Sequence, residues 1–201
     1  MKLKHLEIEL QKISGFENPK ADLEQYLTPP DLAARFLFDA FMHGDIESLR
    51  ILDLGCGTGM LSVGSALLGA EQVTGIDIDA GVLQTAKRNA KKFNLSNIDF
   101  KERKITKNLE PNAFDTSVMN PPFGAQQEHA DRPFIGCALN AAPVVWGIFN
   151  KGSVPFLQAY TKEIAKITDM ISAKLTIPKE FLFHTKDRLE ISVECVRLEK
   201  L

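Results

Sequence analysis

Apolar residues recur along the chain with two different periods, which predict alternating helices and strands. Helical segments place an apolar residue every three or four positions, whereas strands are short apolar runs bounded by glycine, proline or polar residues. Helices are predicted at 1–14, 29–42, 60–68, 80–93, 133–141 and 154–166. Strands are predicted at 51–54, 72–76, 98–101, 114–119, 142–149, 174–177 and 191–198.

This order of elements predicts an α/β protein. Strands separated by helices pair mostly in parallel, because each helix returns the chain to the same end of the sheet. We therefore expect a seven-stranded, mostly parallel sheet with helices on both faces. The short connection between the last two strands predicts one antiparallel strand. We expect one domain over residues 1–201, with a helical N-terminal extension at 1–48, and a ligand site at the carboxyl ends of the strands.

The composition narrows the class of protein. Of 201 residues, 44% are hydrophobic and 25% charged, as in ordinary globular proteins. No apolar run approaches the roughly 20 residues of a membrane span, and the charged N-terminus is unlike a signal peptide. Scattered cysteines predict reduced thiols in a cytoplasmic protein, and neither they nor the four histidines show metal-ligand spacing. The cysteines are Cys56, Cys137 and Cys195.

The charge is unevenly distributed. The formal net charge is −2, which argues against binding to nucleic acid through overall charge alone. Between Lys87 and Lys107, however, eight basic residues face two acidic ones, a local net charge of +6. Two interpretations remain open: a solvated helix face with a charged edge strand, or a patch that binds nucleic acid.

A glycine-rich loop follows the first strand, at residues 53–59 (Asp-Leu-Gly-Cys-Gly-Thr-Gly), and opens the next helix. Glycines there let the backbone turn sharply and approach a ligand. Met60 replaces the third glycine of a dinucleotide fingerprint, so a pyrophosphate cradle is not indicated. Asp77 ends the second strand, 22 residues after Gly55, where a carboxylate can accept both ribose hydroxyls of a nucleoside cofactor. Asp53 is placed to attract a cationic part of that cofactor.

The run Asn120-Pro121-Pro122-Phe123 carries the chemistry. The lone pair of an exocyclic amine is delocalised into its ring, and hydrogen bonds accepted from its N–H groups localise that pair. The Asn120 side-chain oxygen and the Pro121 carbonyl are candidate acceptors, and Phe123 is a candidate ring to stack on the base. Two prolines stiffen the loop. With the glycine loop, this run predicts S-adenosylmethionine-dependent methylation of a planar nitrogen, most often the N6 amine of adenine.

These motifs together with Gln25-Tyr26-Leu27-Thr28 resemble a class I methyltransferase, which implies a Rossmann-like fold. More narrowly, the chain resembles the small-subunit ribosomal RNA adenine-N6 methyltransferases, the methyltransferase-like five group and its archaeal relatives. The narrower resemblance extends nearly end to end. It rests on 15–17 and 19–20, on 23–26 with Thr28, on 119–124 and 131–134, and on Phe183-His184.

The resemblance implies a site, a substrate and a partner. The expected cofactor residues are Gln25, Thr28, Asp53, Gly55, Gly57, Thr58, Gly59, Met60, Asp77 and Ile78. Residues 120–123 are expected to be catalytic, and Arg132, His184 and Lys186 are candidate contacts to RNA phosphate. The family also implies a heterodimer with a small zinc-binding activator protein, which adds a strand to the open edge of the sheet.

The sequence departs from the family pattern at two places. Lys104 lies where relatives usually carry an Asp that accepts the amine of the cofactor's adenine. Either Glu102 replaces that residue, or backbone and apolar contacts hold the ring. A His that follows the fifth strand in many relatives is absent around 148–151.

Three other functions are compatible with parts of the pattern. Methylation of a protein glutamine would use the same logic, although such enzymes tend to carry Tyr at the position of Phe123 and an N-terminal substrate domain. DNA adenine is a second alternative target, but 201 residues leave no room for a target-recognition domain. An inactive scaffold that binds cofactor or RNA is disfavoured by the intact run 120–123.

Overall fold

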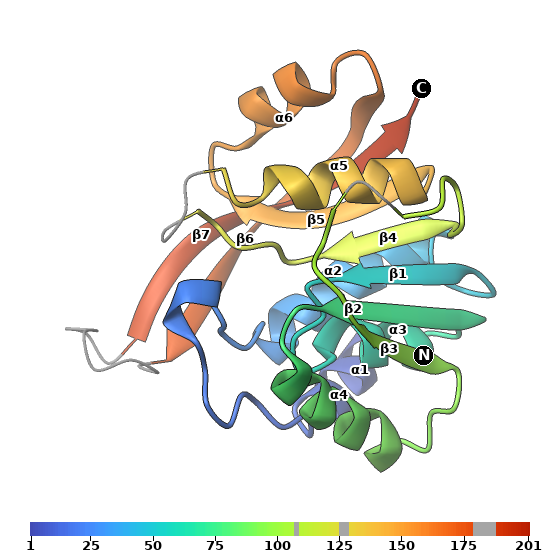
Figure 1. The fold of residues 1–201 in the computed structure, drawn as a ribbon, viewed down its shortest axis with the longest axis vertical. Helices are drawn as coiled ribbons and strands as arrows, with labels where there is room; N and C mark the ends of the chain where they lie inside the picture. Colours follow the sequence, from blue (N-terminus) through green and yellow to red (C-terminus); the bar gives the residue numbers. More distant parts are fainter. Residues whose placement is uncertain (107–108, 125–128, 179–187) are drawn as a thin grey trace.

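The computed structural model of the chain describes residues 1–106, 109–124, 129–178 and 188–201. Its α-helices are α1 (Leu3–Leu10), α2 (Pro30–Met42), α3 (Met60–Leu67), α4 (Ala80–Lys92), α5 (Arg132–Ala141) and α6 (Val154–Thr161). Its strands are β1 (Arg50–Leu54), β2 (Gln72–Asp77), β3 (Ile98–Glu102), β4 (Thr116–Met119), β5 (Val144–Asn150), β6 (Ala165–Pro178) and β7 (Arg188–Lys200). A short 3-10 turn, η1 (Ala21–Leu23), precedes α2 (Figure 1).

The seven strands form one sheet in the order β3-β2-β1-β4-β5-β7-β6. The strands from β3 to β5 pair in parallel, and β7 runs antiparallel to both of its neighbours. The prediction of a mostly parallel seven-stranded sheet with one antiparallel strand is therefore confirmed. No described helix is both long and apolar enough to cross a membrane.

Alternate residues of each strand face opposite layers of helices, because side chains in a strand point to opposite faces in turn. Ile51 packs with the core formed under α1, α2, α3 and α4, while its neighbour Leu52 packs with the core under α5 and α6. In Figure 1, α5 and α2 lie on opposite sides of the sheet. Phe36 and Trp146 are fully buried in the first of these cores and meet edge to face.

The prediction for 154–166 is wrong at its end, because α6 stops at Thr161. The Thr161 hydroxyl donates to the Leu157 carbonyl at 2.9 Å, and a turn bonds the Ile164 amide to the Thr161 carbonyl at 2.8 Å. Ala165 then begins β6 opposite Lys200. β6 is 14 residues long, so the predicted strand 174–177 covers only its last part.

The fold brings together the carboxyl ends of three strands. Leu54, the last residue of β1, pairs with Ile76 of β2 on one side and with Met119 of β4 on the other. The chain leaves β1 towards β2 first and reaches β4 later, so the strand order reverses beside β1. Open α/β sheets bind their ligands at such a reversal. The glycine loop, Asp77 and Asn120 all follow directly from these ends.

Candidate active site

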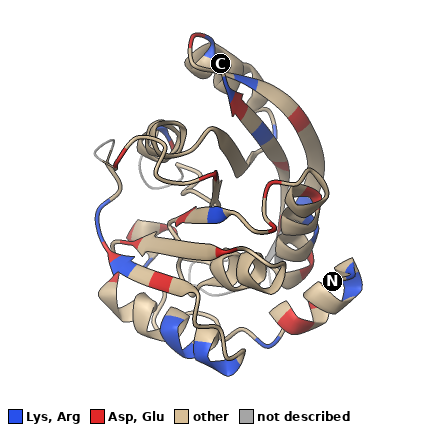
Figure 2. Ribbon diagram, turned by 90° about the vertical axis from the view of Figure 1, so that its right-hand side faces the viewer, with Lys and Arg blue, Asp and Glu red and all other residues tan. Residues whose placement is uncertain are grey.

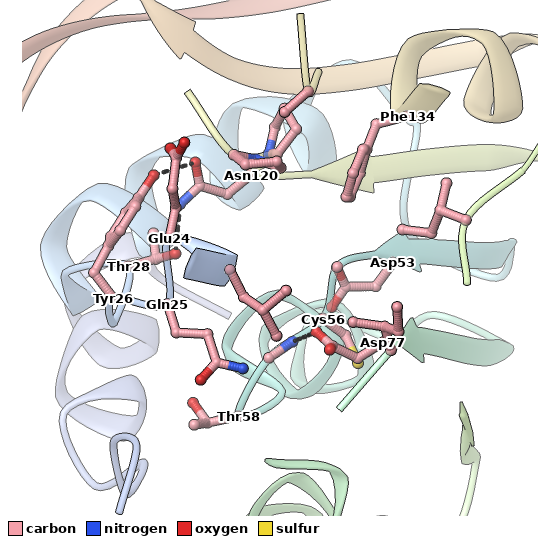
Figure 3. A pocket seen from close by; sticks show the side chains of 18 of the residues that line it. Glu24, Gln25, Tyr26, Thr28, Asp53, Cys56, Thr58, Asp77, Asn120 and Phe134 are labelled. Carbon is pink, nitrogen blue, oxygen red and sulfur yellow. Dashed lines mark hydrogen bonds between the residues drawn. The ribbon is translucent and has the colours of Figure 1, made fainter. Parts of the chain in front are cut away.

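A cavity of about 420 Å³ lies at these carboxyl ends (Figure 3). Its wall combines the segment before α2, the glycine loop, the end of β2, and the residues around Asn120 and the start of α5. Most of the expected site residues line it: Gln25, Thr28, Asp53, Gly55, Gly57, Thr58, Met60, Asp77, Ile78, Asn120, Pro121 and Pro122. Gly59 and Phe123 are not among its described lining residues.

The glycine loop has backbone angles that side chains rarely adopt. Gly55 and Gly57 have φ values of +70° and +52°. A Cβ on Gly55 would lie 2.9 Å from the ring of Phe134, and one on Gly57 would lie 3.1 Å from the ring of Phe16. Both rings belong to the cavity wall. The glycines therefore bring backbone and aromatic walls close together. Gly59 instead precedes α3 as its N-cap residue.

Asp77 presents a bonded carboxylate to the cavity. One oxygen accepts the Gly57 amide at 2.9 Å and the other accepts the Asp79 amide at 3.0 Å. Burial raises the pKa of Asp77, while these backbone donors act in the opposite direction. Each oxygen can accept a further hydrogen bond. A pair of ribose hydroxyls would fit that remaining capacity.

Asp53 is buried, with only one oxygen bonded. Its Oδ2 accepts the Ser62 hydroxyl at 2.6 Å, whereas its Oδ1 has no hydrogen-bond partner among the described residues. Burial raises its pKa to about 7, against the opposing effect of the bond from Ser62. An unpaired carboxylate oxygen in a cavity wall fits a cationic ligand, because the cation would replace the interactions with water that the oxygen loses on burial. The ammonium and sulfonium groups of S-adenosylmethionine are such cations.

Gln25 lies in the cavity wall, but both ends of its side chain are already bonded. Its oxygen accepts the Lys20 amide at 2.9 Å, and its nitrogen donates to an Asp79 oxygen at 2.9 Å. The Lys20 ammonium reaches the same Asp79 oxygen at 2.9 Å. Gln25 thus ties the chain before α2 to the start of α4. Its role in cofactor binding stays a prediction.

Thr28 and Tyr26, from the segment before α2, contact the side chain of Asn120. Its nitrogen donates to the Thr28 hydroxyl at 2.9 Å, and its oxygen lies 3.5 Å from the Tyr26 hydroxyl (Figure 3). Phe123 packs against Tyr26, with ring centroids 5.7 Å apart and planes tilted by 42°. Stacking of Phe123 on a target base stays a prediction.

The two departures from the family pattern lie in the site region. Lys104 and Ile105 both line the cavity, whereas Glu102 is exposed and is not among the described lining residues. Of the two alternatives, this arrangement favours backbone and apolar contacts to the cofactor ring over a substitute carboxylate. Asn150, the last residue of β5, donates from its side-chain nitrogen to the Phe123 carbonyl at 3.4 Å.

The candidate RNA contacts are only partly described. Arg132 begins α5, immediately before the lining residues Pro133 and Phe134, and its guanidinium lies 5.4 Å from the ring centre of Phe156. His184 and Lys186 lie outside the described residues. Among the residues that are described, no group of three or more His, Cys, Asp or Glu side chains could hold a metal ion.

Several wall residues were not assigned to the site from the sequence. Phe16 and Phe134 pack against the glycine loop, and Glu24 accepts the backbone amide of Phe123 at 2.7 Å. Tyr26 belonged to the quoted motif but had no assigned role. The signal for Phe134 was its place in the first turn of a helix that follows the run 120–123. Phe16 and Glu24 lie in segments that carry the family resemblance, 15–17 and 23–26, but a resemblance does not say what their side chains contact.

Comparisons with known proteins identify the family to which the chain is related. The model of the "Methyltransferase small domain" family matches residues 28–141. An uncharacterized protein of Methanocaldococcus jannaschii is 40% identical over all of this chain and 95% of its own length. The Danio rerio rRNA N(6)-adenosine-methyltransferase METTL5 is 34% identical, covering 98% of each chain. A crystal structure from Pyrococcus horikoshii, assigned provisionally to the RNA methyltransferases, has a TM-score of 0.92 at 36% identity and covers 100% of this chain and 98% of that one.

The resemblance seen in the motifs is thus confirmed over essentially the full length, and with it the expectation of S-adenosylmethionine as cofactor. The matched family region contains Thr28, the glycine loop, Asp77 and Asn120, which contribute to the cavity wall. This chain belongs to the methyltransferase small domain family.

Proposed function

We propose that this protein transfers a methyl group from S-adenosylmethionine to the N6 amine of adenine in ribosomal RNA of the small subunit. The observation that carries the proposal is the Asn120 amide, held at the wall of a cavity whose other wall carries Asp53 and Asp77. The full-length similarity to an enzyme named for methylation of rRNA adenosine supports the choice of substrate.

When bound, S-adenosylmethionine supplies a methyl group on a sulfonium, an electrophile that needs no metal or oxidant. The residues of this chain hold the acceptor. The Asn120 oxygen and the Pro121 carbonyl accept the two N–H groups of the target amine, which localises its lone pair on nitrogen. The surplus proton passes to water after transfer, so no strong base is required. Most of the rate would come from alignment of the reacting atoms.

The RNA surface is proposed to include Arg132 and the rings beside it. Phe156 stacks on Tyr160, with centroids 5.5 Å apart and planes inclined by 27°, and the Arg132 guanidinium lies over Phe156. Guanidinium and aromatic planes are the surfaces on which unpaired bases stack. This group adjoins the cavity through Pro133. Nucleotides that flank the target adenine would contact it, while the basic face of α4 attracts the phosphate backbone.

We also propose the partner implied by the family resemblance. β3 has β2 as its only neighbour in the described sheet, so its other edge is open to a further strand. An open edge presents unpaired backbone groups and is a template for strand addition. A small zinc-binding activator protein would occupy it and form a heterodimer. The complex is proposed to act in the cytoplasm.

The test is methyl transfer by Asn120→Ala compared with the native chain. Its oxygen matters to the target amine rather than to the cofactor, so turnover should fall by at least about a hundredfold while the cofactor Kd stays within about twofold. Radiolabelled methyl transfer would be measured to transcribed small-subunit rRNA, to the same RNA in double-stranded form, and to a glutamine-containing peptide. Methylation of the peptide alone would replace the proposal with the glutamine alternative, and equal loss of cofactor binding would make the loop structural.

A further inference from the structure

The chain just before α2 contacts the side chain of Asn120. Thr28 lies close to the start of α2, in a segment held by the contacts between Gln25, Lys20 and Asp79. The Thr28 hydroxyl accepts the Asn120 Nδ2 group at 2.9 Å, and Thr28 itself is buried. The expected role of Thr28 was cofactor binding, yet its hydroxyl already serves Asn120.

Tyr26 determines which way the Asn120 amide is turned. Burial raises the pKa of Tyr26 well above its usual range, so its hydroxyl stays a neutral donor. A donor without an acceptor is costly where it is shielded from water, and the acceptor of this part-buried hydroxyl among the described residues is Asn120 Oδ1, 3.5 Å away. If the amide were turned over, Oδ1 would face Thr28 and the Tyr26 proton would lose that acceptor.

The backbone of the same loop is held by Glu24. Its carboxylate accepts the Phe123 amide at 2.7 Å, a charge-assisted bond that is stronger than a neutral one. Asn150 donates to the Phe123 carbonyl from the other side, at 3.4 Å. The loop that carries Asn120 is therefore bonded at its backbone by Glu24 and at its side chain by Thr28 and Tyr26.

We propose that Thr28 and Tyr26 are positioning residues for methyl transfer, which hold the Asn120 amide so that its oxygen can accept the target amine. This inference rests on the proposed transfer to an amine. An amide oxygen has two acceptor positions, so the long contact from Tyr26 leaves one for the substrate. The Thr28 hydroxyl accepts a hydrogen bond from Nδ2 of Asn120. It thereby keeps the donor end of the amide away from the target amine, whose N–H groups that end would repel.

The discriminating change is Thr28→Val, which keeps the shape of the side chain and removes its oxygen. Thr28→Ser keeps the hydroxyl and is the matched control. With transcribed small-subunit rRNA, we expect kcat to fall at least about tenfold in the Val variant, with the calorimetric Kd of S-adenosylmethionine within about twofold of the native value. The Ser variant should regain kcat to within about threefold. Tyr26→Phe should lower kcat less, because its contact is longer.

A second measurement does not depend on RNA. The side-chain NH₂ protons of Asn120 can be followed by nitrogen-15 NMR and amide exchange. We expect slow exchange in the native chain and the Ser variant, and fast exchange in the Val variant, because the Nδ2 donor then has no partner. Unchanged exchange in the Val variant would overturn the positioning role of Thr28, whatever the activity.

The outcomes separate the two proposals. If the native chain methylates no RNA even with the activator protein present, but the exchange pattern is as expected, the proposed substrate is wrong, and Thr28 and Tyr26 would position Asn120 for another amine. If the Val variant loses cofactor affinity and kcat in proportion, Thr28 binds cofactor and the positioning role is rejected.

Discussion

Asp53 couples cofactor binding to pH. Its raised pKa, about 7, means that the carboxyl is half protonated near pH 7 in the free protein. A bound cation favours the carboxylate, so binding should release a proton. As pH falls through this pKa the binding-competent form is lost, and the Kd of S-adenosylmethionine should rise roughly fivefold from pH 7 to pH 6. Calorimetry in two buffers with different ionisation enthalpies would measure both affinity and proton release.

Asp53→Asn is the control for this pH dependence. The pKa of Asp77 is also raised by burial, and the Asn variant separates its contribution from that of Asp53. The variant should bind more weakly at pH 8 and change little between pH 7 and pH 6. An equal slope in the variant and the native chain would assign the proton to another group.

At the scale of secondary-structure elements, the sequence predicted more of the sheet than of the connections between the parts of the site. β1 and β2 could be predicted because 51–54 and 73–76 are short segments rich in apolar and β-branched residues, bounded by glycine, polar or charged residues. The long β6 was shortened in the prediction because apolar residues alternate there with Thr, Ser and Lys, and this two-residue period overlaps the helical pattern before it. The contact of Tyr26 with Asn120 joins residues 94 positions apart, a separation at which no periodicity carries information.

Buried hydrogen bonds of Asp45 connect the turn after α2 to the sheet, and their loss should lower the stability of the protein. Asp45, in the turn after α2, accepts both Nε and Nη2 of Arg197 in β7, at 2.7 and 3.1 Å, and also the Trp146 indole at 2.8 Å. The two charged side chains are 9% and 13% exposed. Without Asp45, Arg197 would keep its ion pair with Glu199 at 3.0 Å, but the buried Trp146 N–H would lose its acceptor, which costs about 2 kcal/mol. Asp45→Ala should therefore lower the unfolding free energy by about that amount in urea titrations.

An exposed ion pair on the same strands provides the comparison. Lys174 of β6 and Glu190 of β7 are 69% and 61% exposed at their 2.9 Å contact. Glu190→Ala should change the unfolding free energy by less than about 1 kcal/mol, because solvent screens such a pair. If both variants lose the same amount, the Asp45 network contributes no more than a surface pair does.

On the scale of the whole molecule, basic side chains are concentrated in one region. Lys and Arg gather on the exposed side of α4 and at the end of β3, as Figure 2 shows, while the net charge of the chain is −2. Exposed residues of α4 include Lys87, Arg88, Lys91 and Lys92. Lys104 belongs to the cavity wall, so a charge reversal there would disturb the cofactor site as well as the basic region. Charge-reversal variants that test whether the basic region binds RNA are therefore best confined to α4.

The proposed activator is predicted to bind at the open edge of β3. The Asn97 carbonyl accepts from Val73 and the Arg103 amide donates to Asp77, both at the boundary with β2. Backbone groups alternate along a strand, so the N–H of Glu102 points to the open edge. Glu102→Pro removes that donor without touching the bonds to β2, and proline is tolerated at edge strands. Glu102→Ala changes the same exposed side chain but keeps the N–H.

When the chain is co-expressed with the zinc-binding activator, the Ala variant should elute as a heterodimer in size-exclusion chromatography. The Pro variant should elute as a monomer with native-like thermal stability. A Pro variant that still forms the heterodimer would place the partner on another surface, whereas loss of the heterodimer in both variants would mean that the Glu102 side chain makes the contact rather than the strand edge.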